Sequence, residues 1–234
     1  IRLEATSEHG CTDFIYHEVT VYPKPKSMLE LVGESLSCPP FEAEVENNSL
    51  GANLTNNYDY GDGATLQTTS MENVTNTYYN TNSYVQPYTI TLLVETEYGC
   101  QDVSSQTVYV YPDVTANFDF DPGDEACNPF VVTMVNSSVN SSTYIWDFGD
   151  SFSSNVSEPI HRFVNSSTTD RVFDVELIAY SEFDCSDTIS KPITVYAAPV
   201  AAFIVDPPLQ IYPNTTFGLN NLSVPMSPEW VYTW

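Results

Sequence analysis

The 234-residue sequence predicts an all-β fold made of tandem β-sandwiches, and three observations carry this prediction. The chain has 16 Tyr and 12 Phe but only 9 Gly and 6 Lys and Arg, a mixture that favours half-buried strands over amphipathic helices. Apolar residues alternate with a period of two in several short runs. Whole blocks of sequence recur after about 85 to 89 residues.

The alternation is clearest in two runs. Ile90, Leu92 and Val94 share one face if residues 90–95 form a strand, and Val175, Leu177 and Ala179 do the same in residues 174–179. Turn signals such as Pro112-Asp113, Pro122-Gly123-Asp124 and Asn220-Asn221 separate the runs. Several short strands within about 86 residues predict a sandwich of two sheets.

The repeats define the expected domains. Residues 1–11 align without a gap on residues 90–100, and both segments end in Gly-Cys. Residues 19–23 (VTVYP) recur as residues 108–112 (VYVYP) and residues 193–197 (ITVYA). We therefore expect the C-terminal part of one repeat in 1–24, whole repeats in 25–112 and 113–198, and the N-terminal part of a fourth in 199–234. This division predicts that the chain is a part of a much longer protein.

A second motif recurs in the middle of each whole repeat. Its copies are Tyr58-Asp59-Tyr60-Gly61-Asp62-Gly63 and Trp146-Asp147-Phe148-Gly149-Asp150-Ser151. Tyr144, Trp146 and Phe148 alternate onto one face and are expected to be buried, while Gly149 allows the turn that follows. The carboxylates of Asp147 and Asp150 are expected to accept backbone N–H groups of that turn, with metal ligation as the alternative.

These residues resemble a known family. Trp146-Asp147-Phe148-Gly149-Asp150, followed by residues 159–163 (PIHRF) and 173–177 (FDVEL), is similar to the polycystic-kidney-disease (PKD) signature W-D-F-G-D-G, P-x-H-x-Y and Y-x-V-x-L. The first copy departs from it, with Tyr58 in place of the tryptophan and Asn76-Thr77-Tyr78 in place of His161-Arg162-Phe163. The resemblance covers nearly the whole chain and implies immunoglobulin-like sandwiches, as in giant Bacteroidota surface proteins exported by type IX secretion.

The five cysteines follow the repeat. One equivalent position holds Cys11, Cys100 and Cys185, and another holds Cys38 and Cys127, each of which begins Cys-x-Pro-Phe. Of the three ways to pair four cysteines, we expect Cys38 with Cys100 and Cys127 with Cys185, the pairing that respects the repeat. Cys11 would then bond a residue in the missing part of its own repeat. Asn214 and Thr215 stand where the last repeat would need a cysteine.

Paired cysteines indicate a compartment outside the cytosol, so the protein is expected to be secreted or displayed on a cell surface. No run approaches the roughly 20 apolar residues of a membrane span, and direct membrane insertion is not expected. Asp187-Thr188-Ile189 resembles the O-glycan acceptor triplet of secreted Bacteroidota proteins, which makes Thr188 a candidate glycosylation site.

The net charge of −25 argues against nucleic acid and anionic lipid as partners, because both require a basic surface. Cations suit this charge better. The acidic run 119–125 supplies Asp119, Asp121 and Asp124 as weak calcium candidates, although it lacks the spacing of an EF-hand. Calcium is the one cofactor that the sequence suggests.

Catalytic motifs are absent: the sequence contains no His-Glu-x-x-His, no Gly-x-Ser-x-Gly and no glycine-rich phosphate loop. We expect that the chain is not an enzyme. We expect it to be a structural segment of a stalk, filament or adhesin that serves attachment, gliding or prey capture. Its expected partners are neighbouring repeats of the same chain and identical chains in a filament.

Two alternatives remain open. The chain could be an accessory module of a secreted hydrolase, which an exposed row of aromatic rings would favour, and the candidate cluster is Tyr78, Tyr79, Tyr84 and Tyr88. It could also be a surface-layer protein, a role that suits its acidity.

Overall fold

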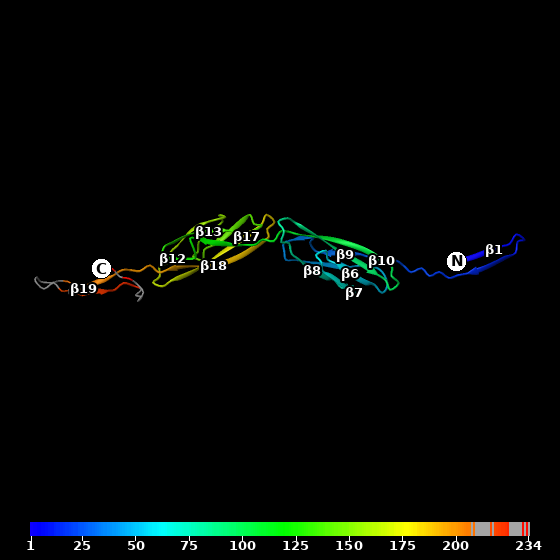
Figure 1. Cartoon of the computed structure of the whole chain (residues 1–234), viewed down its shortest axis with the longest axis horizontal. Helices are drawn as coiled ribbons and strands as arrows, with labels where there is room; N and C mark the ends of the chain where they lie inside the picture. The colour runs from blue at the N-terminus through cyan, green and yellow to red at the C-terminus, as the bar shows by residue number, and fades with distance from the viewer. Residues whose placement is uncertain (207, 209–215, 217, 225–230, 232, 234) are drawn as a thin grey trace. The chain divides into compact units, whose positions relative to one another are not determined.

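A computed structural model of the chain describes residues 1–206, 208, 216, 218–224, 231 and 233 (Figure 1). The fold is all-β, and within these residues there is no helix, hence none long and apolar enough to cross a membrane. The chain divides into two compact units, and the boundary lies between Pro112 and Asp113. Asn214 and Thr215, which stand where the last repeat would need a cysteine, lie outside the described residues.

The first unit contains a hairpin and a complete sandwich. The hairpin pairs β1 (Arg2–Thr6) with β2 (Thr12–Tyr16). One sheet of the sandwich has the order β3 (Leu29–Val32), β5 (Phe41–Asn47), β8 (Val74–Tyr78). The other has the order β4 (Leu36–Ser37), β10 (Gln101–Val110), β9 (Gln86–Glu95), β6 (Thr55–Asp59), β7 (Thr65–Thr68).

The second unit repeats this arrangement and ends in a hairpin. Its smaller sheet has the order β11 (Phe118–Asp121), β13 (Phe130–Asn136), β16 (Ile160–Phe163). Its larger sheet has the order β12 (Glu125–Cys127), β18 (Ser186–Tyr196), β17 (Arg171–Tyr180), β14 (Thr143–Asp147), β15 (Ser153–Ser154). The hairpin pairs β19 (Phe203–Asp206) with β20 (Gly218–Asn221).

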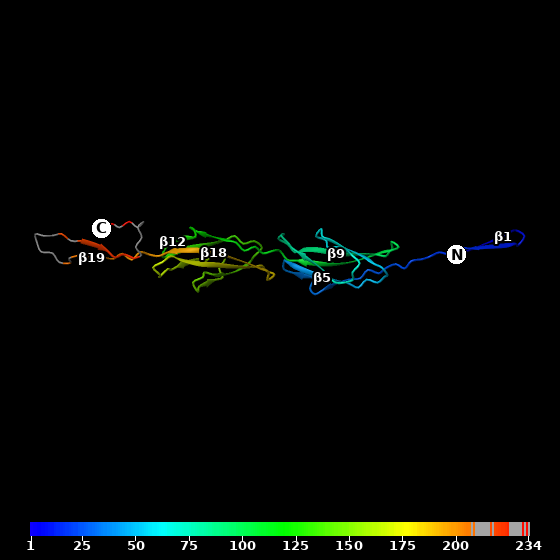
Figure 2. The same cartoon turned by 90° about the horizontal axis from the view of Figure 1, so that it is seen from below.

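The two sandwiches therefore share one strand order, which makes the chain a tandem of immunoglobulin-like β-sandwiches (Figure 2). In both, a short strand pairs in parallel with the end of the last long strand: β4 with β10 and β12 with β18. Their other named pairs are antiparallel. The division into 1–24, 25–112, 113–198 and 199–234 stays a prediction beyond the boundary at Pro112.

The core of each sandwich lies between its two sheets. In β9 the side chains of Ile90, Leu92 and Val94 are fully buried, as the alternation predicted. In β17 Val175 and Leu177 are also fully buried. Intervening residues such as Thr89 and Asp174 are exposed, which is the pattern of a strand with one face in a core. Burial of these apolar side chains is the main favourable term in folding.

Candidate functional site

The Asp-rich turns of the recurring motif are held by local hydrogen bonds. Asp59 Oδ1 accepts the N–H of Gly61 at 2.9 Å, and Asp147 Oδ1 accepts that of Gly149 at 2.8 Å. The second aspartate of each motif does the same: Asp62 Oδ1 accepts the N–H of Ala64 at 2.8 Å, and Asp150 Oδ1 accepts that of Phe152 at 3.2 Å. The carboxylates thus bind the turn backbone, which agrees with the structural interpretation of the motif.

Two glycines of this motif allow the turn to pack against a neighbouring strand. Gly61 has φ +77° and Gly149 has φ +73°, both in the left-handed region. A Cβ at Gly61 would lie 2.6 Å from the carbonyl oxygen of Thr89, and one at Gly149 would lie 2.7 Å from that of Asp174. Any other residue would therefore meet both backbone strain and a clash.

Two of the three aromatic residues of the motif are buried as predicted. Trp146 and Phe148 are buried, and Tyr144 is half-buried against the same core. The indole Nε1 of Trp146 donates to the carbonyl of Val156 at 2.9 Å, so the buried ring leaves no polar atom unpaired.

In the first repeat, Tyr58 and Tyr60 take the two buried positions. Tyr78 is buried beside them, and its hydroxyl donates to the carbonyl of Tyr60 at 2.9 Å. Burial raises the pKa of Tyr78 to about 12, because the phenolate would lose its hydration in the core.

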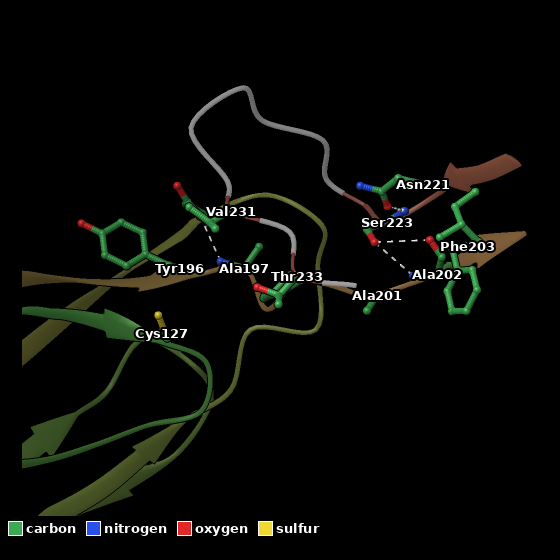
Figure 3. A pocket seen from close by; sticks show the side chains of 13 residues that line it. Cys127, Tyr196, Ala197, Ala201, Ala202, Phe203, Asn221, Ser223, Val231 and Thr233 are labelled. Carbon is green, nitrogen blue, oxygen red and sulfur yellow. Dashed lines mark hydrogen bonds between the residues drawn. The ribbon is translucent and has the colours of Figure 1, made fainter.

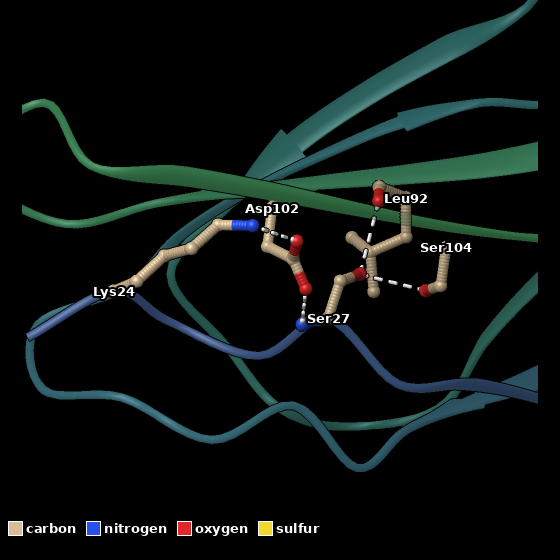
Figure 4. A network of polar contacts seen from close by, with 5 residues as sticks. All are labelled: Lys24, Ser27, Leu92, Asp102 and Ser104. Atoms are coloured by element: carbon tan, nitrogen blue, oxygen red, sulfur yellow. Dashed lines mark hydrogen bonds and ion pairs between the residues drawn. The ribbon is translucent and has the colours of Figure 1, made fainter.

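Each sandwich has an entry end, where the chain enters it, and Asp102 organises this end in the first repeat (Figure 4). One of its carboxylate oxygens lies 2.7 Å from Lys24 Nζ, and the other accepts the N–H of Ser27 at 2.9 Å. The lysine and the backbone amide stabilise the charged form and hold the pKa of Asp102 below its usual value. The hydroxyl of Ser27 donates to the carbonyl of Leu92 at 3.1 Å.

The second repeat uses the equivalent aspartate without the lysine. Asp187 accepts the N–H of Ala116 at 2.8 Å, which ties the incoming chain to the start of β18. A further contact at the entry end of the first repeat is aromatic. The rings of Tyr22 and Tyr98 stack with centroids 3.6 Å apart, so the linker before residue 25 packs on the β9–β10 hairpin.

At the opposite, exit end each repeat has one buried asparagine that was not predicted from the sequence. Asn80 Nδ2 donates to the carbonyls of Tyr84 and Val110 at 2.7 and 2.8 Å. Asn165 Nδ2 donates to those of Thr169 and Val195 at 2.8 and 2.9 Å. Both fasten a loop to the last strand. The signal available in the sequence was an Asn two residues after Tyr78 and after Phe163, the aromatic residues that end β8 and β16.

The predicted disulfide pairs within each repeat are wrong. The thiols of Cys100 and Cys127, one member of each predicted pair, are free, and so is that of Cys11. Strand register gives the reason. Cys38 follows β4, which pairs with the end of β10, and Cys100 lies just before the start of β10.

The ten residues of β10 span about 30 Å, whereas the Cα atoms of a disulfide lie within about 7 Å. Cys127 and Cys185 are separated in the same way, because Cys127 pairs with Tyr196 at the end of β18 and Cys185 directly precedes that strand. Each repeat thus holds its two cysteines at opposite ends.

A cavity of about 970 Å³ lies at the exit end of the second repeat, lined by Cys127, Tyr196 and Ala197 and by residues of β19 and β20 (Figure 3). Phe203 and Leu219 in this lining occupy the repeat positions of Phe118 and Met134, which are fully buried core residues. The apolar lining is therefore the inner face of a sandwich sheet, and it does not carry the signature of a ligand site.

The calcium candidates do not form a cluster. Asp119, Asp121 and Asp124 are all exposed, and no group of three or more potential ligands comes together among the described residues. Asp119 is instead paired with Lys191 at 2.9 Å. The glycan candidate Thr188 lies exposed in β18, directly after Asp187.

The tyrosine cluster that an accessory binding module would need is only partly exposed. Tyr79 and Tyr84 are exposed at 62% and 61%, whereas Tyr78 is buried at 1%. Tyr88 is half-buried, packs on Tyr78 with ring centroids 4.8 Å apart, and donates its hydroxyl to the carbonyl of Tyr79. Tyr78 and Tyr88 therefore pack in or against the core of the sandwich, and only Tyr79 and Tyr84 are exposed.

No known protein family and no curated protein sequence matches the chain. Solved structures that match include the fibronectin(III)-like modules of Clostridium thermocellum CbhA, at 12% identity and TM-score 0.32 over 73% of this chain and 94% of that one. Immunoglobulin domains 1–4 of Sidekick-1 match at 10% identity and TM-score 0.36 over 83% and 57%. A Ca²⁺-stabilised ice-binding adhesin of an Antarctic bacterium matches at 10% identity and TM-score 0.38 over 84% and 55%.

Proposed function

We propose that the chain is a non-catalytic spacer segment of a long secreted or cell-surface protein, built from PKD-type repeats that serve as a stalk, filament or adhesin shaft. The observation that carries this proposal is the polarity of each sandwich. In the first repeat the incoming chain is fastened to Asp102 near the start of β10, and the outgoing chain leaves after Val110 at the other end of that strand.

Entry and exit of the chain are thus separated by nearly the full length of β10, about 26 Å. The second repeat has the same layout, with Asp187 at the start of β18 and Tyr196 at its end. A module traversed from end to end adds reach with every copy, whereas a module whose termini lie side by side does not. Few linker residues separate Val110 from the first bridge of the next repeat at Thr115.

The PKD assignment is supported by the chemistry of the recurring motif. In both repeats the aspartates cap the turn, a glycine approaches a strand backbone, and aromatic rings lie in the core. The type of secretion, a filament of identical chains and an O-glycan at Thr188 remain parts of the proposal. Attachment, gliding and prey capture all suit a spacer of this kind.

Small-angle X-ray scattering of the whole 234-residue chain tests the spacer role. We expect an extended particle with a defined range of separations between the two units, and insertion of Gly-Ser residues between Pro112 and Asp113 should broaden that range, because a flexible linker lets the units take many separations. A compact particle that the insertion does not change would overturn the proposal.

The accessory-module alternative has its own readout, based on exposed Tyr79 and Tyr84. The chain is mixed with insoluble cellulose, chitin and xylan, and depletion from the supernatant is measured beside a Tyr79→Ala, Tyr84→Ala variant. The spacer role predicts equal recovery of both proteins. Depletion of the parent chain that the double variant abolishes would favour the accessory module instead.

A further inference from the structure

Tyr22 and Tyr98 bring two phenol rings together at the entry end of the first repeat. Their ring centroids lie 3.6 Å apart and their planes differ by 13°, which is a face-to-face stack. Tyr22 is 44% exposed and Tyr98 is 55% exposed, so both rings are open to solvent. The pair therefore combines close approach with access for an oxidant in solvent.

Hydrogen bonds and an ion pair hold the backbone near both tyrosines. Tyr98 lies in the turn between β9 and β10, where the N–H of Thr96 donates to the carbonyl of Cys100 at 3.0 Å. The other ring belongs to the linker, two residues before Lys24. The ion pair of Lys24 with Asp102 holds this part of the chain at the start of β10 (Figure 4). Both partners of the stack are thus fastened to the same end of the sandwich.

Two other tyrosine pairs in the first repeat lack one of these properties. Tyr58 and Tyr60 are both buried, with ring centroids 6.2 Å apart. Tyr78 is buried as well, and its ring is tilted by 31° against that of Tyr88. An oxidant in solvent therefore reaches neither ring of the first pair and at most one ring of the second.

We propose that Tyr22 and Tyr98 are a site of oxidative cross-linking, in which a bond between their ortho ring carbons (Cε) gives a dityrosine. Two phenols that already lie in contact react within one molecule, so no collision of separate rings is needed. The equivalent hairpin position holds His9 in residues 1–24 and Phe183 in the second repeat, and neither side chain carries a phenol. The site is thus particular to the hairpin of the first repeat.

The reaction removes two electrons and two protons in total. Each phenol gives up one electron and its hydroxyl proton to become a phenoxyl radical, whose unpaired spin is shared with the Cε carbons. The two radicals form one Cε–Cε bond, and the hydrogen on each of these carbons then moves as a proton to a phenol oxygen, which restores both aromatic rings. The oxidant is hydrogen peroxide consumed by a haem peroxidase, and it is reduced to two molecules of water.

Bond formation draws the two rings from a stack into an edge-to-edge contact. Neither ring is part of the buried core cluster of the first sandwich, and both are about half exposed. The rings can therefore turn toward each other without displacing core side chains.

The cross-link changes how the first repeat carries a pulling force. Tension that arrives along the linker at Tyr22 passes through the new bond to Tyr98 and bypasses residues 23–97, which include strands β3 to β9. Unfolding of the bypassed part then adds no length, whereas without the bond these residues add about 250 Å when fully extended. Unlike a disulfide, the carbon–carbon bond is not cleaved by thiols.

Peroxidase treatment of the 234-residue chain tests the cross-link. Cys11, Cys100 and Cys127 are first replaced by serine, because their free thiols would quench phenoxyl radicals. The chain is then oxidised at low concentration with a haem peroxidase and hydrogen peroxide. The monomer is isolated by size-exclusion chromatography, cleaved after glutamate and analysed by mass spectrometry.

We expect dityrosine fluorescence in the monomer fraction and a peptide that joins residues 19–30 to residues 98–125 with the loss of two hydrogen atoms. Residues 19–30 contain Tyr22 as their one tyrosine, and fragmentation of the joined peptide should locate the other end of the bond at Tyr98. A monomer without this peptide, or one in which Tyr22 is joined to a different tyrosine, overturns the proposal.

Variants and force measurements supply an independent readout. Tyr98→Phe keeps an aromatic ring in the stack but lacks the phenol, so the joined peptide should be lost. The control Tyr84→Phe removes an exposed phenol elsewhere and should leave the joined peptide unchanged.

In single-molecule pulling from both ends, oxidation should shorten the released contour length by about 250 Å in the parent chain and leave that of Tyr98→Phe unchanged. Equal lengths before and after oxidation of the parent chain contradict the bond. The cross-link does not depend on the spacer role, because either can fail while the other holds.

Discussion

His161 Nε2 lies 2.8 Å from Asp150 Oδ2, and both side chains are largely buried, with 14% and 13% of their surface exposed. The first repeat builds the same bridge with a different residue, since Asn76 Nδ2 donates to Asp62 Oδ2 at 2.8 Å. In the second repeat the imidazole also stacks on Phe148, with ring centroids 4.1 Å apart. The aspartate that caps the turn is therefore also the anchor that ties the turn to β16 or β8.

If this bridge holds the turn, variants at its two residues should lower the free energy of unfolding by different amounts. Asp150→Ala removes the acceptor of both the Phe152 N–H and His161, and should lower the free energy of unfolding of the second sandwich by about 1 to 3 kcal/mol. His161→Asn should cost less, because asparagine makes this contact in the first repeat. Urea unfolding measures both, followed by Trp146 fluorescence in a background where phenylalanine replaces Trp230 and Trp234. Equal losses for the two variants would show that the bridge is not what holds the turn.

The two glycines of the first turn predict unequal costs. Gly61→Ala combines left-handed strain of about 1 to 2 kcal/mol with a Cβ placed 2.6 Å from the Thr89 carbonyl oxygen. Gly63→Ser meets open space, and Ser151 already stands at the equivalent position with φ 76°. Thermal unfolding should therefore show a clearly larger loss for Gly61→Ala. A larger loss for Gly63→Ser is the contrary result.

The buried phenol of Tyr78 should make the stability of the first sandwich fall at alkaline pH. Its pKa is raised to about 12 by burial, so the folded state favours the protonated phenol. That contribution to stability is complete below pH 10, the ordinary tyrosine value, and is lost as the pH rises through about 12.

Tyr78→Phe has no phenol to ionise at this position but loses the hydrogen bond to Tyr60, and should be less stable by about 1 kcal/mol at pH 7. Between pH 10 and 12 its stability should fall less steeply than that of the parent chain. Urea unfolding at a series of pH values measures the two slopes. Parallel slopes would mean that Tyr78 does not govern the alkaline transition.

Asp102 predicts an acid dependence at the entry end. Its pKa is lowered by Lys24 and by the Ser27 amide, so the stability that it contributes is present above the ordinary value near 3.8 and is lost as the pH falls through its lower value in the folded protein. Asp102→Asn should weaken protection of the Ser27 amide in hydrogen exchange at pH 7. Lys24→Gln is the matched control, since it leaves the amide acceptor in place and should preserve most of the protection.

The sequence was sufficient for everything that depends on local spacing. Alternation in 90–95 and 174–179 located two buried strands, because side chains of a strand point to opposite faces in turn. The recurring Asp and Gly positions predicted capped turns, since these interactions reach only two residues along the chain. The all-β sandwich followed from these short-range patterns.

Contacts between residues far apart in sequence could not be read in the same way. Tyr78 and Tyr79 are adjacent and alike, yet one is buried under Tyr60 and the other exposed, because β8 presents alternate faces and ends there. Asn80 and Asn165 gain their role only when the last strand passes beside their loops. No local signal specifies that approach.

The cysteines show most clearly how local spacing and long-range contacts determine different things. The sequence by itself determined that they fall into two equivalent positions, since the repeat carries that information. Only the tertiary structure decided that the two positions lie at opposite ends of a sandwich, because the parallel pairing of β4 with β10 and of β12 with β18 is a long-range contact. Spacing along the chain sets which residues are equivalent, and strand register sets which of them can meet.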